Sequence, residues 1–262
     1  MSPPTSSISA SGSMAASKPA KIDDYVGLAH APRAATSCTV KPISIKIDDG
    51  ADGAVAGGGV VGPSSMYVSL ADKLASLEKP VTTLRLDYRY PARNKLCVRD
   101  VFGAMNELER QYHISNFVLV GWSFGGAPVF TVGGSDKRVI GCATVASQTA
   151  ETEGVKSLAP RPLLLLHGTG DRTLSYSCSE RLFAQYGSTG DRELKLFEGD
   201  DHALTRNSLE AERRIGAFIL KCAAIDANDE TEATLNQKLV QDEDKIGLME
   251  KGGDLRGHES VK

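Results

Sequence analysis

The segment Gly121-Trp122-Ser123-Phe124-Gly125-Gly126 carries the strongest chemical pattern in the chain. It places a serine in a G-x-S-x-G motif, after the apolar run at 117–120 and before the small-residue stretch at 125–130. A serine on a sharp strand-to-helix turn has a strained backbone, and small neighbours allow the turn to close. The nearby helix N-terminus favours developing negative charge. The pattern predicts a nucleophile at Ser123; the alternative is an incidental serine in a glycine-rich turn.

A serine hydroxyl becomes an effective nucleophile only when a base takes its proton, so the histidines come next. His202 lies in a loop (198–203) between an expected strand and the last expected helix, where it can reach across to Ser123. His167 ends the apolar run PLLLLH, where a structural histidine is expected. The other three lie in less informative places: His30, His113 and His258. The sequence therefore favours His202 as the base.

The acid that orients such a base must follow another strand and point into the same crevice. Asp171 does so, because it leaves the PLLLLH strand through the glycine-rich turn at 168–170. Asp200 and Asp201 are closer to His202 along the chain, but neighbours on one loop rarely place a carboxylate against the ring, and both fit turn positions. Asp191 also lies in a turn. Asp171 is the favoured acid, and the other three aspartates remain alternatives.

Strands and helices alternate around these residues. The two nearly continuous apolar runs at 117–120 and 162–167, each followed by a glycine, are typical of strands buried on both faces. Strands joined through helices build a mostly parallel sheet, with active sites at the carboxyl ends of the strands. The expected strands are 42–48, 53–56, 81–87, 117–120, 139–145, 162–167 and 193–197, and the expected helices 65–77, 97–112, 179–186 and 209–222.

The order of elbow serine, then G-x-x-D after an apolar strand, then D-H before the final helix resembles that of the α/β-hydrolase superfamily. The resemblance covers about residues 42–223 and is nearest to the small lidless enzymes of the dienelactone-hydrolase-like and prolyl-oligopeptidase-like classes. It implies a three-layer α/β sandwich without a cap domain. It also implies a serine hydrolase that cleaves an ester, thioester or amide through an acyl-enzyme, with Ser123, Asp171 and His202 as catalytic triad.

The same resemblance implies an oxyanion hole built from backbone amides. One donor is the amide of Phe124, and the other comes from the loop after the third strand, for which we choose Gly58 within the glycines at 57–59. Relatives usually open this loop with His-Gly, whereas this chain has Ala56 followed by glycines. The alternative is that these glycines only form a tight turn.

The interval between the elbow and Asp171 limits the substrate. Residues 146–160 are all that remain for the connection in which larger relatives insert a cap. Such a length makes one short helix or loop, so we expect an open, shallow crevice and a small acyl substrate. An acyltransferase that uses the same triad, and a catalytically silent binding protein with this fold, remain alternatives.

The composition limits the classes of protein to which the chain can belong. The 262 residues carry a net charge of −3, 41% hydrophobic and 24% charged residues, which is typical of a globular protein and gives no basic nucleic-acid footprint. No apolar run approaches the roughly 20 residues that cross a bilayer. The five cysteines form no C-x-x-C pair, so we expect buried free thiols, a reducing, cytoplasmic setting, no metal and no cofactor. Oligomeric state is not indicated.

The two ends have different compositions from the middle. Residues 1–24 are rich in Ser, Ala and Pro and are expected to be disordered, with a transit peptide as the alternative. Residues 25–224 form the expected hydrolase domain. Residues 225–262 hold ten acids, five Lys or Arg and no aromatic residue. They are expected to be mostly disordered and to lie outside the fold, with at most a short helix at 232–240.

Overall fold

A parallel four-stranded sheet forms the centre of the protein. The computed structural model describes residues 22–35, 38–45, 47 and 60–255. The strands are β1 (Phe117–Trp122), β2 (Val139–Val145), β3 (Leu163–Gly168) and β4 (Arg192–Phe197), in the spatial order β1-β2-β3-β4. Each of the four matches an expected strand to within two residues at its ends. Since all pairs are parallel, the carboxyl ends of the strands meet at one edge of the sheet.

Helices occupy the connections, as the periodicity predicts. Four of the five helices up to residue 222 match expected helices, the fifth, α3, begins in the small-residue stretch after Ser123, and two more follow residue 222 among the described residues. The helices are α1 (Met66–Ala75), α2 (Asn94–Tyr112), α3 (Gly126–Ser135), α4 (Ser177–Tyr186), α5 (Ser208–Cys222), α6 (Asp229–Leu235) and α7 (Lys245–Gly252), and the 3-10 helices are η1 (Ile22–Leu28), η2 (Pro63–Ser65), η3 (Ser123–Gly125) and η4 (Glu153–Ser157).

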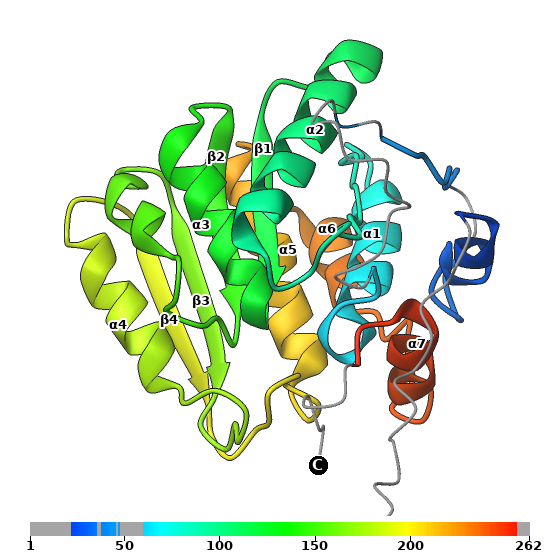
Figure 1. Cartoon of the computed structure of the whole chain (residues 1–262). Helices are drawn as coiled ribbons and strands as arrows, with labels where there is room; N and C mark the ends of the chain where they lie inside the picture. Colours follow the sequence, from blue (N-terminus) through cyan, green and yellow to red (C-terminus); the bar gives the residue numbers. More distant parts are fainter. Residues whose placement is uncertain (1–21, 36–37, 46, 48–59, 256–262) are drawn as a thin grey trace, which may run out of the picture.

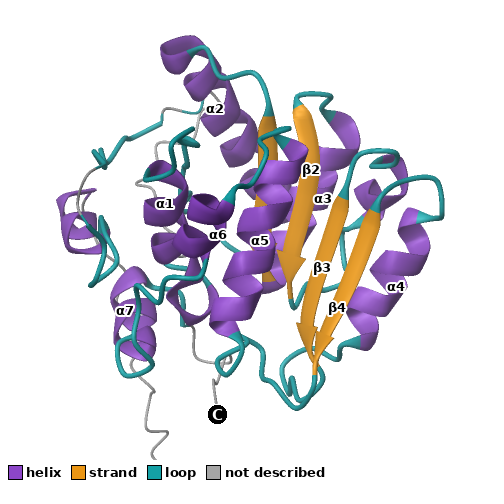
Figure 2. Ribbon diagram, turned by 180° about the vertical axis from the view of Figure 1, so that it is seen from behind, coloured by secondary structure: helices purple, strands orange, loops and turns teal. Residues whose placement is uncertain are grey.

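The sheet lies between two helical layers (Figures 1 and 2). Side chains of β2 and β3 alternate between two apolar clusters. Leu164 and Leu166 pack with α1, α5 and α6 on one face, whereas Leu163 and Leu165 pack with α2, α3 and α4 on the other. All four leucines are almost fully buried, and each such burial contributes about 1.5–3 kcal/mol. The expected three-layer sandwich is confirmed, and no cap domain interrupts the described residues.

Two expected strands near the N-terminus are not strands in the described structure. Residues 42–45 and 47, and residues 81–87, have no ladder partner, and the expected strand at 53–56 lies outside the described residues. The apolar side chains of these segments are nevertheless packed: Ile45 and Ile47 approach Gly103 of α2, and Leu84 and Leu86 join the cluster of α2 and α3. An alternation of apolar and polar residues indicates which side chains are buried. A strand also needs a neighbouring strand to which its backbone is hydrogen-bonded.

The described part of the acidic C-terminal segment packs on the domain, contrary to the expectation for residues 225–262. Leu235 and Met249 are buried in the cluster around α1 and α5. The Lys73 ammonium donates to the Leu235 carbonyl, and the Asp254 carboxylate accepts N–H bonds from Val61 and Gly62. A few apolar anchors and buried polar contacts suffice to hold a segment whose average composition is that of a solvated tail. Of the expected disordered N-terminal segment, residues 1–21 lie outside the described residues.

The connection at 146–160, the cysteines and the lengths of the helices can also be compared with the expectations. The connection at 146–160 contains only the short η4, as its length predicts. All five cysteines are free, but only Cys97 and Cys142 are buried, while Cys38, Cys178 and Cys222 are partly exposed. Among the described residues, no helix has the length and apolar character needed to cross a membrane.

Candidate active site

Ser123 lies on the sharp turn between β1 and α3. Its backbone φ is +54°, in the left-handed region that non-glycine residues rarely adopt, and its side chain is mostly buried. A Cβ on Gly121 would collide with the carbonyl oxygen of Gly125, so the turn requires glycine at that position. The strained conformation and the close approach match the geometry that the G-x-S-x-G motif predicts.

His202 and Asp171 lie side by side at the same edge of the sheet. His202 Nδ1 is 2.7 Å from Asp171 Oδ2, although the residues are 31 positions apart in the chain. Asp171 follows β3 and His202 follows β4, and the two loops are joined by backbone bonds from Thr169 N–H to the Phe197 carbonyl and from Gly170 N–H to the Asp200 carbonyl. The parallel pairing of β3 with β4 therefore brings together the predicted acid and base.

The contact determines which nitrogen of His202 can act as a base. An ionised carboxylate only accepts hydrogen bonds, so the Nδ1 of His202 carries the proton and donates it to Asp171. In the neutral ring Nε2 then presents a lone pair. That atom is buried and has no hydrogen-bond partner among the described residues, Ser123 included. A buried, unpartnered acceptor is costly, and its retention is typical of a site that binds a ligand or moves a proton.

Trp122, next to Ser123, holds the histidine loop. Its indole Nε1–H donates to the His202 carbonyl at 2.9 Å, and the two rings lie 5.4 Å apart. The residue before the nucleophile thus links β1 to the loop after β4. This link has no local signal in the sequence, because it joins residues 80 positions apart.

Asp171 is enclosed by donors. Its Oδ1 accepts the backbone N–H groups of Thr173 and Leu174, and its Oδ2 contacts the rings of both His202 and His167. Burial by itself raises the pKa of this carboxyl, but the hydrogen bonds from His167 and His202 outweigh it and hold the pKa far below its usual range. The carboxylate is therefore ionised throughout the neutral range.

His167 is a second imidazole on the same acid. Its Nε2 lies 3.1 Å from both Asp171 Oδ2 and the Leu174 carbonyl, so this nitrogen donates; its Nδ1 accepts from the Ser179 hydroxyl at 2.7 Å. Both ring nitrogens are occupied and the side chain is fully buried. The expectation of a structural histidine fits these contacts, but its partner is the candidate catalytic acid, which the sequence did not reveal.

Comparison with solved structures identifies the fold. Est1E from Butyrivibrio proteoclasticus is similar with a TM-score of 0.53 at 16% identity over 61% of this chain and 82% of that chain. An esterase of Pyrococcus furiosus gives 0.51 at 14% over 59% and 75%, and an α/β serine hydrolase homologue from Coxiella burnetii gives 0.50 at 21% over 61% and 78%. This chain has the α/β-hydrolase fold. No protein-family model and no curated protein sequence matches it.

Within this α/β-hydrolase fold, the alternative acids have other partners. Both oxygens of Asp200 accept backbone N–H groups of the His202 loop, among them those of Arg206 and Asn207, and Asp201 accepts those of Ala203 and Thr205. Asp191 forms an exposed ion pair with Lys221. Asp200 and Asp201 act as turn residues, and of the four aspartates Asp171 alone is hydrogen-bonded to the His202 ring among the described contacts.

The cavity at the nucleophile differs from the expected shallow crevice. Ser123 and Phe124 line a cavity of about 720 Å³, and only 8% of the Ser123 surface is exposed. Most of the lining is apolar and comes from α1, α2, β1 and the segment at 81–88 that runs beside β1 without pairing. Although the described residues include no cap, Ser123 is not on an open surface, because the unpaired segment at 81–88 and β1 border a partly open cavity next to the elbow.

Of the two predicted oxyanion donors, the structure describes one. Phe124 follows Ser123 within η3 and lines the same cavity. Gly58 lies outside the described residues.

Proposed function

We propose that this protein is a serine hydrolase that cleaves an ester, thioester or amide of a small acyl group through an acyl-enzyme. The observation that carries the proposal is the 2.7 Å contact of His202 Nδ1 with the buried Asp171, which leaves the buried Nε2 without a partner at the sheet edge that holds the strained Ser123. A binding scaffold has no need for a base held in this tautomer.

In the proposed reaction, Ser123 Oγ attacks the acyl carbonyl carbon while His202 Nε2 takes the hydroxyl proton. Asp171 holds the ring in the correct tautomer and stabilises the imidazolium. The Phe124 amide and an amide of residues 57–59 stabilise the negative oxygen of the tetrahedral intermediate. The intermediate expels the leaving group, which takes the proton from His202, and the acyl group remains on Ser123. Water then repeats the sequence and releases the acid.

The cavity supports a small, mostly apolar acyl group. Its volume of about 720 Å³ and its aliphatic lining suit a hydrocarbon or aromatic acyl chain more than a charged one. Two of the similar solved structures support an acyl substrate: the Pyrococcus furiosus protein is an esterase, and Est1E has been solved with ferulic acid bound. An acyltransferase would use the same triad and replace water with an alcohol or amine.

A fluorophosphonate probe tests the proposal. We expect covalent labelling of the wild-type chain at Ser123, located by mass spectrometry of the labelled peptide, and no labelling of Ser123→Ala. Ser188→Ala is the matched control, because Ser188 is an exposed serine in the turn before β4, at the opposite end of that strand from the His202 loop, and its loss leaves labelling unchanged. Unlabelled wild type, or equal labelling of Ser123→Ala, contradicts the proposal. The ratio of acid to ester product in water–alcohol mixtures then separates a hydrolase from an acyltransferase.

A further inference from the structure

Three side chains from separate parts of the sequence meet away from the active site: His30, Cys38 and Asp72 of α1. His30 Nδ1 lies 2.7 Å from Asp72 Oδ1, Cys38 Sγ lies 3.6 Å from the same oxygen, and Cys38 Sγ lies 4.0 Å from His30 Nδ1. Nitrogen, sulfur and oxygen are the donors that Zn²⁺ takes in proteins. The cluster belongs to neither the proposed triad nor its loops.

The arrangement differs from a catalytic Cys-His-Asp set. In such a set the two ring nitrogens face different partners, whereas here the single atom Nδ1 of His30 is the one nearest to both Asp72 and Cys38. The three donor atoms therefore surround one point and do not form a relay. All of them lie within 4.8 Å of one another.

The donor spacing is close to that of a tetrahedral site. Bond lengths of about 2.0–2.3 Å at tetrahedral angles separate a nitrogen from an oxygen ligand by about 3.4 Å, and a sulfur from either by about 3.6 Å. The sulfur–oxygen distance is already 3.6 Å, and the sulfur–nitrogen distance must shorten only from 4.0 Å. The nitrogen–oxygen distance must lengthen from 2.7 Å, as expected when a metal replaces the proton between the two atoms.

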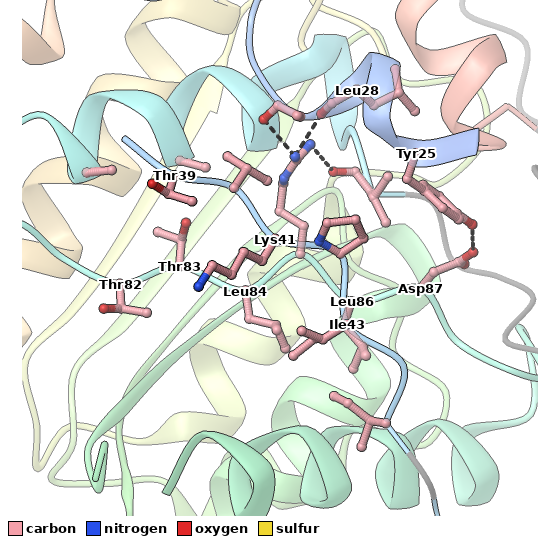
Figure 3. A pocket seen from close by; sticks show the side chains of 18 of the residues that line it. Tyr25, Leu28, Thr39, Lys41, Ile43, Thr82, Thr83, Leu84, Leu86 and Asp87 are labelled. Atoms are coloured by element: carbon pink, nitrogen blue, oxygen red, sulfur yellow. Dashed lines mark hydrogen bonds between the residues drawn. The ribbon is translucent and has the colours of Figure 1, made fainter. Parts of the chain in front are cut away.

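The surroundings orient the donors and leave a position open. The second oxygen of Asp72 accepts the Ala31 N–H at 2.7 Å, which orients this carboxylate as outer hydrogen bonds orient metal ligands. Cys38 and Asp72 line a cavity of about 660 Å³, part of which is drawn in Figure 3. Water from this cavity can supply a fourth ligand. The Arg85 guanidinium nearby donates to the carbonyls of Leu28, Ala29 and Val60, so its charge lowers cation affinity without occupying the site.

We propose that His30, Cys38 and Asp72 form a binding site for a divalent transition-metal ion of the Zn²⁺ type, with a water molecule as the fourth ligand. Binding replaces the thiol proton: the S–H bond breaks, the sulfur–metal bond forms, and one proton passes to solvent. In the neutral ring of His30 the proton on Nδ1 moves to Nε2 by exchange with solvent, which frees the Nδ1 lone pair for the metal and adds no proton to this count. A free cysteine thiol is mostly protonated at neutral pH, so this release is measurable. A thiolate and an imidazole disfavour Mg²⁺ and Ca²⁺, which prefer oxygen ligands.

The site would join the N-terminal segment to α1. Residues 30 and 38 flank a short stretch of chain, and Asp72 lies 34 positions beyond Cys38. A metal ion at this point would therefore close a long loop and stabilise the folded state in proportion to its occupancy. The proposal does not depend on the hydrolase function, because none of its ligands contacts Ser123, Asp171 or His202 among the described contacts.

Titration of the chelator-treated full-length chain with Co²⁺ tests the site. We expect a thiolate-to-cobalt charge-transfer band that saturates at one equivalent and is bleached by Zn²⁺. Cys38→Ser should abolish the band, and His30→Gln should lower Co²⁺ affinity by at least about 10-fold, because both remove a direct ligand. Cys178→Ser is the matched control, a partly exposed free cysteine outside the cluster, and it should keep the band. Circular dichroism checks that each variant is folded.

Two results overturn the proposal: a wild-type chain without the band, and a folded Cys38→Ser variant that keeps it. Calorimetry in buffers of different ionisation enthalpy gives a second reading. Zn²⁺ binding should release about one proton from the wild type, through the Cys38 thiol. Zn²⁺ binding without proton release places the ion elsewhere and also contradicts the assignment.

Discussion

Two buried aspartates each hold a histidine in this protein, and the two pairs are built differently. Asp171 contacts Nδ1 of His202 and leaves its Nε2 buried without a partner, whereas Asp72 contacts Nδ1 of His30 at a point that Cys38 also approaches. Both contacts measure 2.7 Å. The distance between carboxylate and imidazole therefore does not distinguish the two pairs. They differ in the other ring contacts: the Nε2 of His202 has no partner among the described residues, whereas Cys38 approaches the same Nδ1 of His30 that contacts Asp72.

The surroundings of the two carboxylates reinforce this difference. Asp171 has four donors on its two oxygens, and these come from the end of β3 and from the loops after β3 and β4, at the sheet edge where α/β folds place their active sites. Asp72 lies on α1, away from that edge, and its neighbours come from the N-terminal segment. This difference supports the two proposals, proton transfer at the first pair and metal binding at the second.

The largest expected effect comes from Asp171. Asp171→Asn should lower kcat for a p-nitrophenyl ester by about 10⁴, because the amide no longer holds His202 in the correct tautomer. The measurement is steady-state kinetics beside Asp201→Asn, whose side chain binds only loop N–H groups among its described contacts and should cost far less. A larger loss of kcat in Asp201→Asn than in Asp171→Asn would show that Asp171 is not the acid that orients His202.

A variant of His167, the second imidazole on Asp171, tests whether the donors around this carboxylate contribute to its role. His167→Leu should lower kcat by about 10–100-fold with little change in KM, because the acid loses one of the donors that position it, an effect of the size seen for outer-shell partners. His167→Gln keeps a donor at the same reach and should restore part of the loss. Equal kcat in the leucine variant and the wild type would make His167 purely structural.

The cavity at Ser123 predicts a smaller, substrate-dependent effect. Rates along a p-nitrophenyl ester series from acetate to palmitate should peak at short to middle chain length, because the described residues include no cap that would enclose a long chain beyond the cavity of about 720 Å³. Met105 lines this cavity and not the one near Asp72. Met105→Phe narrows the cavity and should therefore move the optimum to shorter esters. Rates that rise steadily to palmitate would refute a small acyl substrate.

The smallest effect concerns stability against pH. Since the pKa of Asp171 is lower in the folded chain than its unfolded value of about 3.9, its contribution is fully present above that pH and is lost as the pH falls toward the folded pKa. The difference in unfolding free energy between wild type and Asp171→Asn should therefore be constant near neutral pH and shrink below about pH 3.9. Urea unfolding at several pH values measures it, and a constant difference down to pH 2 would contradict the depressed pKa.

Much of the site was readable from the sequence because its signals are local. The elbow around Ser123, the turn before Asp171 and the loop of His202 each follow an apolar run that became β1, β3 or β4. The three loops converge because parallel strands end at one edge, which is a property of the fold class. The link between Trp122 and His202 was not readable, because it joins elements 80 positions apart.

The sequence by itself determined the alternation of strands and helices from residue 94 to 222, the strained turn at Ser123 and the order of the candidate triad, because each depends on neighbouring residues and on apolar periodicity. Only the tertiary structure decided the rest. Whether 81–87 pairs as a strand depends on a distant partner, and whether Met249 and Asp254 pack depends on the surface they meet. The meeting of His30, Cys38 and Asp72 has the same cause: it follows from where the chain is held in space.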